Sequence, residues 1–264
     1  MILFSFKFYI VSIYYKHIQD LYLFDIIPLL KDTKMKFETL IHGKLIKRYK
    51  RFLADIILDN GEEITAHVPN SGAMTSCIEE GCDVWVTFHD NPKRKLKYTL
   101  ELTKMGKELI CTNTGVANKI AVEAIENGTI KELQGYESLK IEQKYGQNSR
   151  IDILLENEDK KCYVEIKSVS LKIDDTLAFP DAVTARGAKH LKELSDMIDE
   201  GHRAIMLYII QRTDNLPFRL AHEIDKKYKI AFDEATKQGV EVLVYQSDID
   251  LEKIEVKKSV KFIN

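Results

Sequence analysis

Two strand-like runs of this chain constrain its fold most, because together they require a sheet. The runs are residues 149–155 and 163–169, and the polar segment 156–161 separates them. A polar loop between two β-branched runs is typical of a hairpin, so the strands are predicted to lie side by side and antiparallel. Asp152 in the first strand and Glu165 in the second are then neighbours.

Side chains alternate between the two faces of a strand. Glu165 and Lys167 are two residues apart and should point the same way, whereas Val164 and Ile166 should point to the opposite, buried face. Isoleucines flank Asp152 in the same manner. The pattern therefore predicts two carboxylates and an ammonium group on one patch of a sheet whose other face is apolar.

Such a patch is typical of a divalent-cation site. Carboxylate oxygens bind Mg²⁺ or Mn²⁺, the cation polarises a phosphate, and a neighbouring lysine can orient or deprotonate a water. A simpler alternative is a solvated stripe on an edge strand, with Asp152 ion-paired to Arg150 or Lys167. That alternative stays open on the motif alone, because short motifs recur by chance.

Composition adds few constraints on the partner. The 264 residues are 45% hydrophobic, enough for a large core, and 39 Lys and Arg balance 41 Asp and Glu. Nucleic-acid binding would therefore need local basic patches. The four cysteines lack C-x-x-C spacing and no secretory signal is convincing, which predicts a reducing cytoplasm. A zinc site is a weaker alternative, because its ligand spacing is unusual; its residues would be Cys77, Cys82, His67 and His89.

Residues 1–34 are predicted to be an extension outside the core fold. The segment is aromatic and apolar, but Lys7 interrupts it and no small-residue cleavage site follows. Neither a signal peptide nor a spanning helix of about 20 residues fits well. We therefore expect no membrane partner, with a membrane-associated N-terminus as the alternative.

Residues 35–110 are rich in short strands, which predicts a closed five-stranded barrel of the OB type. The expected strands are 37–40, 43–46, 52–58, 63–68, 84–88 and 98–102, with a tight turn at 59–61. Aromatic residues are interleaved with basic ones, as on a surface that binds single-stranded nucleic acid. The basic candidates for phosphate contacts are Arg48, Arg51, Lys93 and Arg94. Many of the aromatic rings must also serve the barrel core.

Residues 111–264 change to mixed helix and strand periodicity, which predicts an α/β domain with a mixed central sheet. Asn118 is expected to cap a first helix that carries Glu123, and Asp181 to open a second that ends at Gly201. Along that second helix Arg186, Lys189 and His190 should share one exposed face. The remaining expected elements are strand 139–142, the buried strand 204–210, helix 225–238 and strand 240–245.

This order of elements resembles the PD-(D/E)xK nuclease superfamily, with Ile151 in place of the proline. More closely, six segments resemble the sugar fermentation stimulation protein A family. They are RFLAD at 51–55, HVPNSGAM at 67–74, SRID at 149–152, YVEIK at 163–167, AFPDAVTARGAKHL at 178–191 and QR at 211–212. The resemblance runs from about Met35 to Tyr245. It implies an OB barrel, a PD-(D/E)xK domain and DNA binding.

The sequence therefore predicts a cytoplasmic nuclease, dependent on Mg²⁺ or Mn²⁺, that hydrolyses DNA or RNA. Asp152, Glu165 and the Ile166 carbonyl would bind the metal, with Glu123 or Glu142 as a further carboxylate, while Lys167 would orient water. Additional phosphate contacts would come from Arg150, Arg186, Lys189 and Arg212. The alternative is a non-catalytic DNA-binding protein or a regulator of sugar-utilisation genes. No residue pattern indicates a sugar site.

Overall fold

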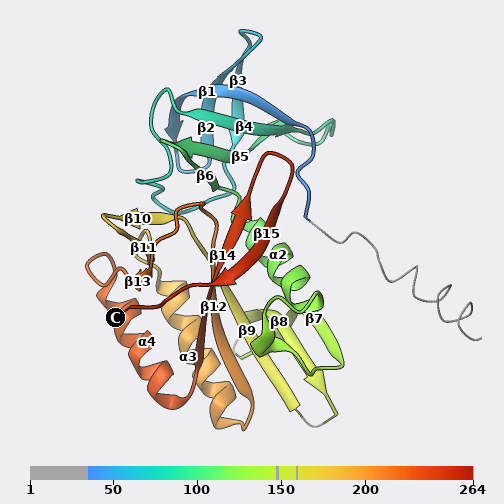
Figure 1. Ribbon diagram of the computed structural model, residues 1–264, viewed down its shortest axis with the longest axis vertical. Coiled ribbons are helices and arrows are strands. Elements are labelled where there is room, and N and C mark those ends of the chain that lie inside the picture. Colours follow the sequence, from blue (N-terminus) through green and yellow to red (C-terminus); the bar gives the residue numbers. More distant parts are fainter. Residues whose placement is uncertain (1–34, 147–148, 159, 264) are drawn as a thin grey trace, which may run out of the picture. The chain divides into compact units, whose positions relative to one another are not determined.

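The structure is a computed structural model that describes residues 35–146, 149–158 and 160–263 (Figure 1). The predicted extension 1–34 lies outside the described residues. A β-barrel comes first and an α/β domain follows, as the sequence predicts. Among the described residues, no helix is both long and apolar enough to cross a membrane.

The barrel has the connectivity of an OB fold. Its strands follow the order β3-β2-β1-β4-β5, and a parallel pairing between β3 and β5 closes it, while β6 continues from β5. Their bounds are β1 (Leu40–Tyr49), β2 (Leu53–Leu58), β3 (Glu63–His67), β4 (Asp83–Phe88), β5 (Tyr98–Met105) and β6 (Glu108–Cys111). The closed barrel confirms the predicted fold class of this region.

The first strand differs from the prediction. Residues 37–40 and 43–46 were expected as two strands, but a single strand, β1, runs from Leu40 to Tyr49. Gly43 lies inside it, where an added Cβ would be 2.6 Å from the Ile57 carbonyl oxygen of β2. The glycine therefore permits the close approach of β1 and β2. In the sequence alone, a glycine at this position instead indicates a break between two strands.

The α/β domain is built on a six-stranded mixed sheet in the order β15-β14-β12-β9-β8-β7. β12 is parallel to both β9 and β14, and the other pairs are antiparallel. The strands are β7 (Ser138–Tyr145), β8 (Ser149–Asn157), β9 (Lys160–Val169), β12 (Arg203–Ile210), β14 (Glu241–Ile249) and β15 (Ile254–Ser259). The predicted central strand is confirmed, since β12 is buried throughout from Ala204 to Ile210.

Helices cover both faces of this sheet (Figure 1). The helix α2 (Gly115–Glu126) packs on one face, and α3 (Ala185–Asp199) and α4 (Lys226–Gln238) pack on the other. Short elements complete the domain: η2 (Lys131–Leu133) and a small sheet of β10 (Leu171–Ile173), β11 (Thr176–Phe179) and β13 (Phe218–Leu220). Both faces are therefore apolar, not one as expected.

Two helix starts were predicted wrongly. The first residue before α2 is Thr114, so Asn118 lies one turn inside the helix and caps nothing. The cap of α3 is Thr184, whose Oγ1 accepts a hydrogen bond from the Gly187 amide. Asp181 lies three residues before this cap, and its carboxylate accepts a hydrogen bond from the Met74 amide, 3.3 Å away on the barrel. The helix therefore begins at its own cap, and Asp181 contacts a residue distant in sequence.

Candidate active site

The site begins where the ladder between β8 and β9 ends. Ile153 and Val164 form the last pair of this ladder. Asp152 lies one residue beyond that pair, and its carboxylate accepts two hydrogen bonds. Its Oδ2 accepts the Ile166 amide hydrogen at 2.7 Å, and its Oδ1 accepts a hydrogen bond from the Asn118 amide at 2.8 Å. Asp152 is thus fixed between β9 and the first turns of α2.

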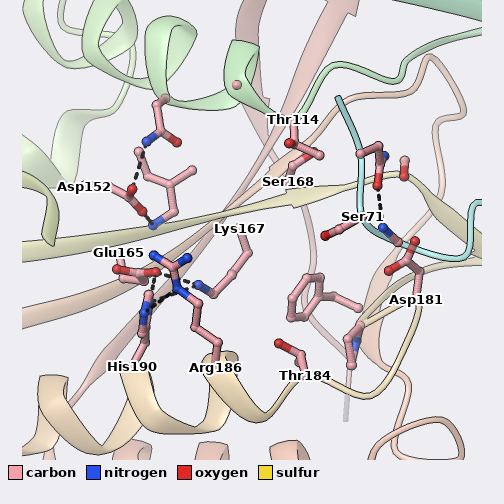
Figure 2. A pocket seen from close by; sticks show the side chains of 18 of the residues that line it. Ser71, Thr114, Asp152, Glu165, Lys167, Ser168, Asp181, Thr184, Arg186 and His190 are labelled. Atoms are coloured by element: carbon pink, nitrogen blue, oxygen red, sulfur yellow. Dashed lines mark hydrogen bonds and ion pairs between the residues drawn. The ribbon is translucent and has the colours of Figure 1, made fainter. Parts of the chain in front are cut away.

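Glu165 lies beside Asp152 and is 2% exposed. Figure 2 shows Lys167, Arg186 and His190 converging on this carboxylate. Lys167 Nζ is 2.5 Å from Glu165 Oε1, and the same oxygen is hydrogen-bonded to His190 Nδ1. The second oxygen, Oε2, is buried and has no hydrogen-bond partner among the described residues. Glu165 therefore carries an unused acceptor inside the protein.

The surroundings of Asp152 and Glu165 shift the pKa values of their carboxyl groups in opposite directions. Burial, and next the charge of Glu165, raise the pKa of Asp152 above its usual range. Burial would also raise the pKa of Glu165, but Lys167 and the hydrogen bond from His190 outweigh burial and hold it below its usual value. Two neighbouring acids whose surroundings shift their pKa values in opposite directions are typical of functional sites.

These residues line a cavity of about 910 Å³. Its walls come from the barrel, through Arg51 and residues 70–72, and from α2, β9 and the segment that leads into α3. Four basic side chains line it: Arg51, Lys119, Lys167 and Arg186. The predicted residues Asp152, Glu165 and Lys167 and the Ile166 backbone are thus brought together, in a cavity that carries both acidic and basic side chains.

Glu142 also lines the cavity, from β7, with a backbone φ of +54°. This conformation is uncommon for a residue with a side chain and often marks a functional site. Glu123 is elsewhere: it is buried on α2, and its Oε2 accepts the Met35 amide hydrogen at 2.7 Å. The structure therefore favours Glu142 over Glu123 as a further carboxylate.

Several predicted phosphate contacts lie away from the cavity. Arg212 is 2% exposed and paired with Asp214 at 2.7 Å, so the prediction of a surface contact is wrong for this residue. Arg48 donates hydrogen bonds to the carbonyls of the barrel loop at 70–73, which it holds in shape. The remaining candidates lie on other parts of the surface and do not line the cavity; they are Lys93, Arg94, Arg150 and Lys189.

The sequence pattern does not predict the roles of two residues that contact the acids. It predicts Asn118 as a helix cap, but Asn118 lies inside the helix, where asparagine is unfavourable, and its amide donates to Asp152. It predicts an exposed His190, but His190 is 4% exposed and is hydrogen-bonded to Glu165. The spacing of Arg186 and His190, four residues apart on one helix, was the signal available, because it makes the two side chains neighbours.

The zinc alternative is not supported by the geometry. All four cysteines are free and buried, and Cys77 donates a hydrogen bond to the Ser170 carbonyl oxygen. His89 instead bonds the hydroxyls of Thr87 and Thr99. Among the described residues, no three His, Cys, Asp or Glu side chains gather as a metal site, so Asp152 and Glu165 stand as a pair.

A closed OB barrel followed by a nuclease-like α/β domain defines the class of this protein. Residues 46–112 match the family described as SfsA N-terminal OB domain, and residues 115–253 match Sugar fermentation stimulation protein RE domain. The chain therefore belongs to the sugar fermentation stimulation protein family, as its motifs indicate.

Relatives with this name are similar over most of their length. A sugar fermentation stimulation protein homolog of Marinomonas sp. (strain MWYL1) is 53% identical over 233 residues, 87% of this chain and 90% of the relative. The homolog of Rhodospirillum rubrum is 48% identical over 229 residues, 82% and 94% of the two chains. A solved structure, Pyrococcus furiosus SfsA in complex with Ca²⁺, shares the fold with a TM-score of 0.79 at 24% identity. That match covers 87% of this chain and 98% of the solved one.

Proposed function

We propose that this chain is a divalent-metal-dependent nuclease that hydrolyses phosphodiester bonds of DNA or RNA. The observation that carries the proposal is the meeting of Asp152, Glu165 and Lys167 in a cavity that Arg51, Lys119 and Arg186 also line. A protein that only bound nucleic acid would gain nothing from two buried carboxylates facing an anionic backbone. Such a pair becomes useful when a cation lies between it and the phosphate.

The residues fit Mg²⁺ or Mn²⁺. Hard divalent cations take oxygen ligands, and the cavity offers carboxylate oxygens of Asp152 and Glu165 beside the backbone of Ile166. Oε2 of Glu165 is buried and has no hydrogen-bond partner among the described residues. Because buried polar atoms are normally paired, this oxygen independently supports a cation as its partner. The Pyrococcus furiosus relative solved with Ca²⁺ supports binding of an oxygen-preferring cation.

In this proposal Asp152, Glu165 and the Ile166 carbonyl would hold the metal. The bound cation would polarise the phosphate and neutralise its charge. Asn118 and the Ile166 amide hold Asp152 in place, so its carboxylate needs little rearrangement. Lys167 would orient the attacking water and stabilise negative charge on the phosphate.

The basic lining would guide the substrate. Arg51 from the barrel and Lys119 and Arg186 from two helices line the same cavity as the acidic pair, so a strand crossing the cavity would meet these cations. The barrel would extend this surface, since Phe52 beside Arg51 is 46% exposed and rings stack on unpaired bases. The barrel and the α/β domain would therefore bind one nucleic-acid chain together.

The test is cleavage of labelled DNA and RNA, single and double stranded, by the purified full chain with Mg²⁺, Mn²⁺ or EDTA. We expect metal-dependent product formation from at least one substrate and none in EDTA. Binding without cleavage under every condition would support a non-catalytic nucleic-acid-binding protein or regulator. Absence of both would remove the nucleic-acid assignment altogether.

A further inference from the structure

The buried histidine of α3 has a chemical role that the acidic motif does not explain. His190 is 4% exposed, whereas Lys189 beside it faces solvent. His190 Nδ1 is hydrogen-bonded to Glu165 Oε1 and lies 3.5 Å from Lys167 Nζ. The ring thus touches two members of the acid–acid–lysine set from the helix that covers them (Figure 2).

Arg186 fixes which nitrogen of this ring carries the proton. Its Nε lies 3.2 Å from His190 Nε2, and an arginine nitrogen can only donate, so Nε2 must accept. A neutral imidazole then carries its hydrogen on Nδ1, which donates to Glu165 Oε1. Because arginine can only donate, one hydrogen bond runs from Arg186 Nε to His190 Nε2 and the next from His190 Nδ1 to Glu165 Oε1.

The chain of contacts also decides which oxygen of Glu165 is left over. Oε1 receives Lys167 and His190, and these two donors occupy it. Oε2 is the oxygen without a partner among the described residues. A carboxylate held by two donors at one oxygen cannot rotate freely, so its other oxygen keeps one direction.

We propose that Arg186 and His190 form a positioning relay that holds the Glu165 carboxylate in one orientation and leaves Oε2 without a protein donor, as a ligand for a divalent cation. This inference rests on the proposed function. His190 acts through Glu165 and not on the substrate, so it is a positioning residue. Arg186 orients His190 through Nε, while its guanidinium also lines the cavity where a phosphate would lie.

The relay is tested by calorimetric titration of the full-length protein with Mn²⁺ alone, without nucleic acid. We expect His190→Ala to weaken Mn²⁺ binding about 10- to 100-fold, the usual effect of removing a partner of a metal ligand. His190→Asn should restore most of the affinity, because its Nδ2 can donate from the position of Nδ1. Lys192→Ala is the matched control on the same helix, since Lys192 pairs with Asp196 on the surface.

A second variant, Arg186→Lys, changes an exposed residue, so the substitution does not disturb the packing of the core. Lysine keeps the charge but lacks the fixed Nε donor. We expect weaker Mn²⁺ binding, by less than in His190→Ala. A thermal melt of each apoprotein separates these effects from loss of fold.

The outcomes distinguish this inference from the proposed function. If the wild type binds Mn²⁺ and Glu165→Ala does not, while folded His190→Ala and Arg186→Lys bind like the wild type, the relay is wrong and the metal site remains. Should His190→Ala fail to fold, unchanged affinity in Arg186→Lys together with lost affinity in His190→Asn would equally overturn it. A wild type that binds no Mn²⁺, Mg²⁺ or Ca²⁺ removes the metal-dependent function itself.

Discussion

Charged side chains of the barrel and the buried Glu165 carboxylate of the α/β domain differ in whether protein partners satisfy them. In the barrel, Arg48 donates to backbone carbonyls, and His42 lies between the carboxylates of Asp59 and Asp83. In the α/β domain, Glu165 keeps a buried oxygen that no described residue satisfies. Since buried polar groups are normally satisfied, the unsatisfied oxygen of Glu165 agrees with the ligand site that we propose there.

The largest effect is expected when one of the two carboxylates at the cavity is removed. Glu165→Ala or Asp152→Ala should abolish cleavage, because each removes a proposed metal ligand. Nucleic-acid binding should stay equal or become tighter, because a repulsion toward phosphate is also removed. Gel assays for cleavage and fluorescence anisotropy for binding measure the two properties separately. Variants that cut as fast as the wild type would end the metal-nuclease proposal.

The next largest effect is expected at the buried ion pair of Arg212 and Asp214, which stabilises the fold. Breaking the Arg212–Asp214 pair by Asp214→Asn should cost about 3–5 kcal/mol of the free energy of unfolding, because Arg212 stays buried without its counter-charge. Urea denaturation measures this. Activity per folded molecule should not change, and a variant with wild-type stability but lost cleavage would contradict a purely structural role of this ion pair.

The pH dependence of that pair has a defined sign. Burial would raise the pKa of Asp214, but the hydrogen bond and charge of Arg212 hold it below its usual value. Its stabilisation is then complete above the unfolded-state pKa of about 3.9 and is lost as pH falls through the lower folded-state pKa. The stability gap between wild type and Asp214→Asn should therefore be constant from pH 7 to 5 and shrink below about pH 4.

A smaller effect separates two arginines within the barrel. Arg51→Ala should weaken nucleic-acid binding and reduce the slope of log affinity against log salt by about 1, as for one lost phosphate contact. Arg48→Ala should instead lower stability by about 1–3 kcal/mol, because its hydrogen bonds hold the loop at 70–73. Salt titrations and urea melts decide. An unchanged salt slope in Arg51→Ala would remove the barrel from the binding surface.

The smallest effect is expected at the front of the chain. All strands and candidate ligands named above lie in residues 35–263, so deleting residues 1–34 should leave metal-dependent activity unchanged. A thermal melt against the full chain gives the comparison. A midpoint lower by about 5 °C or more, equivalent to about 1–2 kcal/mol, would show that the segment contributes to the fold.

The sequence by itself determined the order of elements and the acidic motif. Period-two alternation and a polar loop were enough to predict the β8–β9 hairpin, and an apolar run to predict the buried β12, because both signals are local. The same local patterns predicted a closed barrel from short strands. They also placed Asp152 near Glu165, since strand pairing follows from the hairpin alone.

Only the tertiary structure decided which polar side chains serve the site. Arg212 and Arg48 have the charge of a phosphate contact, but packing and backbone carbonyls across the fold use it for structure. His190 looked exposed from helix spacing, yet the face of β9 that carries Glu165 lies under α3 and receives it. Such roles depend on contacts between residues distant in sequence, which no local period encodes. For the same reason the sequence alone could not show that the barrel lends Arg51 to the cavity of the α/β domain.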